Sequence, residues 1–61
     1  MTALPSIGQP ATRALAAVGI TTLEQVATWS RRELLALHGV GPKAVRILDQ
    51  ALAEAGRPPL A

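Results

Sequence analysis

Apolar residues recur at helical spacing in two long stretches of the chain. In the second stretch they follow the pattern i, i+3, i+4, i+7, i+8 and i+11, which places them on one face of a helix. The first stretch keeps the first four positions of this pattern. The positions are Ala44, Ile47, Leu48, Ala51, Leu52 and Ala55 in the second stretch, and Ala11, Ala14, Leu15 and Val18 in the first. The spacing predicts helices over about 9–18 and 42–55, which stop at Gly19 and Gly56.

Capping residues indicate a short helix between these two stretches. Thr21 with Glu24, or Thr22 with Gln25, can form a capping box, in which two residues three apart satisfy each other's backbone N–H groups. We favour Thr22, which predicts a helix over about 23–28. Its inward-facing residues are then Leu23, Val26 and Ala27.

Ser30 and Glu33 form a second capping box and predict a helix over about 31–37. Trp29 precedes the cap and Leu34 takes the fourth helical position, which is the arrangement of a hydrophobic staple. Trp29 is therefore expected in the core. Its alternative role, stacking on a base of a single strand, is less favoured because such surfaces use several aromatic side chains and this chain has one.

The predicted fold class is all-α, a compact domain of four to five helices, because no segment alternates with period two and all connections are short. The whole chain, 1–61, forms one domain with its core at about 4–56 and a loose turn at 4–7. The ends, 1–3 and 57–61, have little to pack against and are expected to be flexible tails.

Composition narrows the class of protein. A domain of 61 residues buries only about 60% of the surface of its unfolded chain, so its stability is small. The chain has no cysteine, which excludes disulfides and thiolate metal sites. It also has no signal peptide and no apolar run near the roughly 20 residues of a membrane span, so a soluble, cytoplasmic protein without membrane contact is expected.

The chain contains an internal repeat with an offset of 33 residues, which aligns segment 4–15 with segment 37–48. Five positions are identical, and Ile7 aligns with Val40. The identical pairs are Leu4 with Leu37, Gly8 with Gly41, Ala11 with Ala44, Arg13 with Arg46, and Leu15 with Leu48. Both halves are thus predicted to be a turn that leads into a helix.

The turn of the second copy has the residue types of an anion site. Gly39 and Gly41 tolerate positive φ and a close approach by another molecule, and Pro42 suits the first helical position. The free N–H groups of the first turn and the helix dipole favour a phosphate there, and Lys43 adds a positive charge. A net charge of +2 permits nucleic-acid binding but predicts only modest affinity.

The second copy resembles the helix-hairpin-helix motif of DNA repair and recombination proteins. The residues at the motif positions are Leu37, Gly39, Val40, Gly41, Lys43 and Ala44. The first copy resembles a degenerate motif, with Ser6 at the first glycine position and Pro10 at the lysine position. The layout, which includes a linker over 18–35, is similar to the C-terminal domain of the bacterial RNA polymerase alpha subunit. The resemblance implies two paired motifs in a SAM-domain-like arrangement.

The resemblance also implies how such a domain binds DNA. The backbone N–H groups of Gly39, Gly41 and Lys43 would donate to phosphates of duplex or structured DNA, supported by the charges of Lys43 and Arg46. Val40 and Ala44 complete the implied interface. The remaining candidates, in a possible second hairpin, are Ser6, Gly8 and Arg13. Because Pro10 removes a donor and a cation, that copy is expected to serve mainly as scaffold.

Two functions stay open at this point. The first is a noncatalytic module that binds the DNA backbone without sequence preference, within a larger parent protein or an oligomer. The second is a protein–protein interaction module that uses the same helical scaffold and binds no DNA. An enzyme is not expected, because His38 has no nucleophile or carboxylate beside it in the sequence, and no cofactor, metal or small-molecule substrate is expected either.

Overall fold

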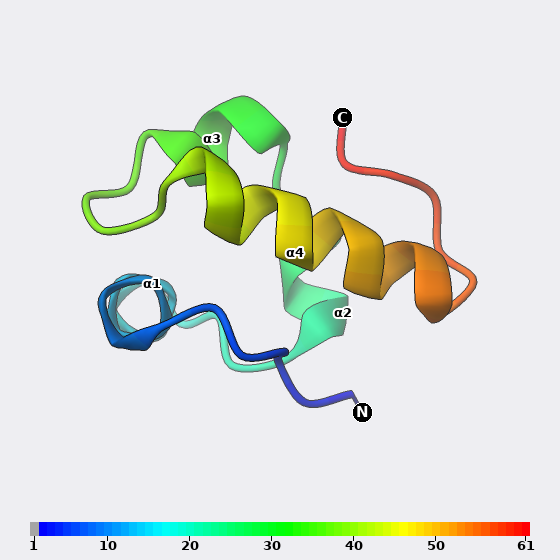
Figure 1. Cartoon of the computed structure of the whole chain (residues 1–61), viewed down its shortest axis with the longest axis horizontal. Coiled ribbons are helices and arrows are strands. Elements are labelled where there is room, and N and C mark those ends of the chain that lie inside the picture. Colours follow the sequence, from blue (N-terminus) through cyan, green and yellow to red (C-terminus); the bar gives the residue numbers. More distant parts are fainter. Residues whose placement is uncertain (1) are drawn as a thin grey trace.

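The computed structural model describes residues 2–61 and contains four helices in that range (Figure 1). They are α1 (Gln9–Ala17), α2 (Leu23–Val26), α3 (Arg31–Leu35) and α4 (Pro42–Glu54). Residues 2–61 form no strand, and their only β feature is an isolated bridge between Ala3 and Thr22. The prediction of a compact helical domain is confirmed, and each helix ends one or two residues earlier than predicted. None of the described helices is both long and apolar enough to cross a membrane.

Both predicted capping boxes are present, and they explain where the two short helices begin. At α2, the Gln25 N–H donates to Thr22 Oγ1 at 3.3 Å, and the Thr22 N–H donates to Gln25 Oε1 at 3.1 Å. At α3, the Glu33 N–H donates to Ser30 Oγ at 3.1 Å, and the Ser30 N–H donates to Glu33 Oε1 at 2.8 Å. These reciprocal bonds satisfy backbone donors that helices of four and five residues would otherwise leave free.

The core lies where α4 packs against α2 and α3, with α1 seen almost end-on in Figure 1. Leucines of every helix meet there. The largest fully buried side chains are Leu15, Ile20, Leu23, Val26, Leu34, Leu48 and Leu52. Trp29 was predicted in the core, but it is only half-buried and packs against this cluster from outside.

Three predicted core residues are exposed instead. Val18 is 41% exposed, and Ala27 and Ala55 also lie on the surface. Each of the three is the C-cap residue of its helix, where the backbone leaves the helical path. The helical spacing of apolar residues therefore extends one residue past the end of each helix, where the side chain no longer faces the core. Leu4 and Ile7 pack against the core, but segment 4–7 forms no turn, contrary to the prediction.

The ends of the described chain are anchored, so the prediction that they have little to pack against is wrong. The Leu23 N–H donates to the Thr2 carbonyl at 2.9 Å. Leu60 is buried, and its N–H donates to Asp49 Oδ1 at 2.9 Å. The Arg31 N–H donates to the Ala61 carbonyl at 2.8 Å. Met1, which belonged to the same prediction, lies outside the described residues.

Candidate nucleic-acid interface

The four helices begin in two different ways. α2 and α3 each begin with a capping box and carry a glutamate in the first turn. α1 and α4 each follow a glycine, have a proline in the first two positions, and carry neither a side-chain cap nor an acid in the first turn. The two helices that follow the predicted hairpins are therefore the two whose N-terminal backbone donors receive no side-chain partner.

The start of α4 presents several unused donors. Among residues 2–61, no hydrogen bond engages the N–H groups of Gly39, Gly41, Lys43 or Ala44. The Val40 N–H is used, because it donates to the Leu37 carbonyl at 3.1 Å. The side chains of Val40 and Ala44 are buried, at 5% and 6% exposure. Of these two predicted contact residues, only Ala44 offers a free N–H group, and neither offers its side chain.

Gly39 is required by the fold. Its φ is 98°, a conformation that residues with a Cβ rarely adopt. A Cβ at this position would lie 2.8 Å from the Pro10 carbonyl oxygen and 3.6 Å from Ala14 Cβ. The second hairpin therefore sits directly on the first turns of α1, and glycine permits that contact.

Gly41 differs from Gly39 both in its backbone conformation and in the space around its Cα atom. Its φ of −103° and ψ of 177° are extended backbone that any residue adopts, and a Cβ there would meet no atom within 4 Å. The fold therefore does not need glycine at Gly41. What glycine provides here is an uncovered backbone beside the unused donors, which suits a close approach by another molecule.

The first hairpin matches the second in its helix but not in its turn. α1 and α4 begin 33 residues apart, at Gln9 and Pro42, as the repeat predicts. The positive φ, however, lies at the N-cap Gly8, at 91°, whereas the second hairpin has it at Gly39, two residues before its N-cap. Ser6 stands at the corresponding first position and has no positive φ. Because a residue with a Cβ avoids that conformation, the turn uses the next available glycine.

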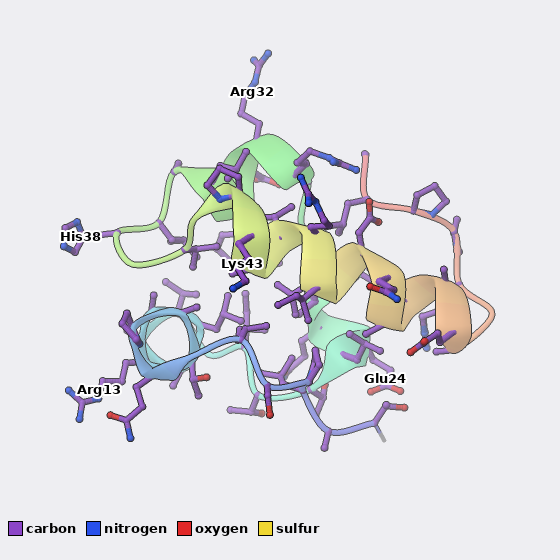
Figure 2. The ribbon with its side chains drawn as sticks, viewed as in Figure 1. Arg13, Glu24, Arg32, His38 and Lys43 are labelled. Atoms are coloured by element: carbon purple, nitrogen blue, oxygen red, sulfur yellow. The ribbon has the colours of Figure 1, made fainter. Side chains whose placement is uncertain are left out.

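The predicted cations lie on more than one surface. Lys43 projects from the first turn of α4, while Arg13 lies at the hairpin end of the molecule (Figure 2). Arg46 lines a groove between α3 and α4 together with Arg31, and Lys43 does not line it. Lys43 and Arg46 are neighbours on α4, one helical turn apart, but only Arg46 lines the groove.

All four carboxylates lie outside the hairpins. Segments 4–15 and 37–48 contain no acidic residue. Glu24, at the opposite end of the molecule in Figure 2, accepts a hydrogen bond from the Thr2 N–H at 2.9 Å. The pKa of Glu24 is lowered from 4.5 to about 2, first by this backbone bond and then by the Thr2 side chain and the Glu24 backbone. Asp49 forms an ion pair of 2.6 Å with Arg31. The role of Asp49 in holding the C-terminal residues was missed, because nothing in the local sequence pairs residue 49 with residue 60.

No protein-family model matches the chain, and no significant match was found among curated proteins or solved structures. The candidate site is therefore defined by the residues and geometry above. It consists of the unused N–H groups at the start of α4, the open backbone at Gly41, and the Lys43 side chain.

Proposed function

We propose that this domain is a noncatalytic module that binds the phosphate backbone of duplex or structured DNA through the hairpin at 39–43. The proposal includes two paired helix-hairpin-helix motifs in a SAM-like arrangement, with the first motif as scaffold. One observation carries the proposal: α2 and α3 satisfy their N-terminal donors with side chains, whereas α4 leaves its donors free beside an uncovered glycine.

The charges of α4 support an anionic ligand. A helix N-terminus carries about half a positive charge, so a cation in the first turn is unfavourable and an anion is favourable. α4 nevertheless has Lys43 in its first turn and Glu54 as its last residue, an arrangement opposed to its own dipole. A phosphate at the N-terminus would attract both the helix dipole and the Lys43 ammonium group, so the net electrostatic interaction of Lys43 would become favourable.

The same geometry supports binding without sequence preference. Sequence is read by side chains that reach base edges, whereas backbone N–H groups and lysine recognise phosphates. At the hairpin the side chains of Val40 and Ala44 are buried, and two of the remaining residues, Gly39 and Gly41, have no side chain. The hairpin therefore offers phosphate donors and little that could distinguish bases.

The affinity of a single domain should be low. With about two to four phosphates neutralised, the logarithm of the affinity falls with the logarithm of salt concentration at a slope of about −2 to −4. Binding near physiological salt would then need a second attachment, either from a larger parent protein or from another copy of the domain.

Titration of isotope-labelled protein with a short DNA duplex, followed by amide NMR, tests this function. The expected shifts centre on residues 39–44 and weaken between about 50 and 200 mM salt. Gly41→Ala is the sharpest variant, because a Cβ at Gly41 meets no protein atom but would cover the backbone that a phosphate must approach. A second variant, Lys43→Ala, removes the cation of the site. Its matched control is Arg32→Ala, which removes a cation that extends from α3 into solvent (Figure 2). Unchanged DNA affinity in Gly41→Ala and Lys43→Ala, or no shifts at low salt, would overturn the proposal.

A further inference from the structure

A groove on another face of the domain carries features that DNA binding at the hairpin does not use. It consists of two neighbouring depressions that share Arg31 and Leu35 and run between α3, α4 and the C-terminal residues. Leu35 is 40% exposed, and the one other large hydrophobic residue so exposed among those described is Val18, at the end of α1. α3 buries Leu34 in the core, whereas Leu35 does not pack against the core cluster and keeps 40% of its surface exposed.

The groove has the length and lining for a short helix. Along α4 it extends from Pro42 to Ala53, which at 1.5 Å per residue is about 16 Å, or about three helical turns. Pro42 and Ala53 on α4, Leu35 on α3 and Pro59 near the C-terminus give it apolar walls. An amphipathic helix places an apolar stripe into such a groove through residues at i, i+3, i+4 and i+7.

The charge of the groove indicates the chemistry of its occupant. Arg31, Arg32 and Arg46 line it, and the single acidic side chain in its lining is Asp49. Asp49 is already engaged, because it pairs with Arg31 at 2.6 Å and accepts the Leu60 N–H. Two guanidinium groups, those of Arg32 and Arg46, therefore have no ion-pair partner within the described residues and lie beside an apolar centre, and their complement is an apolar stripe flanked by carboxylates.

We propose that this groove docks an acidic amphipathic helix of a partner protein, with an apolar side chain of that helix packed against Leu35. A DNA backbone is a poorer occupant, because it has no apolar group to place against Leu35, Pro42 and Ala53. The unused N–H groups of the hairpin do not line the groove. The domain would thus join DNA at one surface to an acidic protein segment at another.

The test uses two labelled helical peptides with the same leucine stripe at i, i+3, i+4 and i+7. One peptide carries glutamate at the positions that flank the stripe, and its twin carries glutamine there. Fluorescence anisotropy should show saturable binding of the glutamate peptide that weakens with salt, and much weaker binding of its twin. Amide NMR of the wild-type domain should place the shifts on residues 30–35 and 45–53, with residues 39–41 unaffected.

Variants separate this surface from the DNA site. Leu35→Gln and Arg32→Gln should each weaken the glutamate peptide, Leu35→Gln by about tenfold, since a central apolar contact contributes more than a charge at the rim. Both variants should leave DNA affinity within about twofold of wild type, because neither residue belongs to the hairpin. Arg13→Gln is the charge-matched control for the peptide, since Arg13 lies on α1 outside the groove.

Four results would overturn the docking proposal. They are no saturable binding of the glutamate peptide at low salt, equal affinity for the glutamine twin, peptide shifts centred on residues 39–41, and DNA shifts that cover the groove. Because peptide and DNA binding are measured separately, a failure of one proposal is distinguishable from a failure of the other.

Discussion

Replacement of Lys43 by glutamate should stabilise the protein and at the same time weaken its DNA binding. Lys43 is the second residue of α4, exposed, and no acid shares its turn. Lysine and glutamate have nearly equal helix propensities, so the substitution changes mainly the interaction with the helix dipole. Removing an unfavourable cation and adding a favourable anion at this position are each worth about 0.3–1 kcal/mol. The net gain should be about 1 kcal/mol.

Thermal unfolding followed by circular dichroism measures the gain. For a domain of this size, a change of about 1 kcal/mol moves the melting temperature by about 4–8 °C. DNA titrations over a series of salt concentrations measure the loss. The slope of log affinity against log salt should decrease in magnitude by about one, because one phosphate contact has been removed, and affinity at low salt should fall further through repulsion.

Arg32→Glu is a closely matched control, because Arg32 is the second residue of α3 as Lys43 is of α4. Arg32→Glu should change stability little, because α3 has only five residues and Arg32 lies in its last turn as well as its first, and it should leave the salt slope unchanged. A lower melting temperature for Lys43→Glu would refute the dipole argument. An unchanged DNA slope in a folded Lys43→Glu protein would refute the site, as would an equal DNA loss in both variants.

The remaining predictions concern the turns and caps. Gly39→Ala should lower the free energy of unfolding by about 1–3 kcal/mol, measured by urea denaturation, because φ is 98° and a Cβ would lie 2.8 Å from backbone oxygen. Gly41→Ala should change it by less than about 0.5 kcal/mol, so equal losses at both glycines would contradict the assignment of Gly39 alone to the fold. Ser30→Ala should cost about 1 kcal/mol, seen as a lower melting temperature, and no change would show that its capping box contributes nothing. Folding lowers the pKa of Glu24 from 4.5 to about 2, so the ionised carboxylate stabilises the protein above pH 4.5 and this contribution disappears as the pH falls toward 2. Glu24→Gln should therefore make the melting temperature less dependent on pH between 4.5 and 2. An unaltered pH profile in Glu24→Gln would refute the Thr2 contact.

Much of the local structure was predictable because its causes are local. Thr22 and Gln25, and likewise Ser30 and Glu33, interact across three residues, so their capping boxes follow from spacing alone. The predictions were wrong at helix ends, as at Val18, because an apolar period does not state where the chain leaves the helix.

The candidate site was predictable only in part. The residue types of the hairpin indicated unused donors near Lys43, and the N–H groups of Gly39, Gly41 and Lys43 do lack hydrogen bonds within the described chain. The equal treatment of the two glycines was wrong, because only Gly39 has a positive φ and a close neighbour. That neighbour is α1, and its distance from the hairpin cannot be read from spacing within residues 37–48.

The sequence by itself determined which segments are helical, how the short ones are capped, and that the two long helices begin 33 residues apart. These features arise from hydrogen bonds and side-chain periods within a few residues. The tertiary structure alone decided that Gly39 lies against α1, that Leu60 is buried beside Asp49, and that Arg46 lines a groove together with Arg31 of α3. Those outcomes depend on how helices pack, which brings together residues that are far apart in the chain.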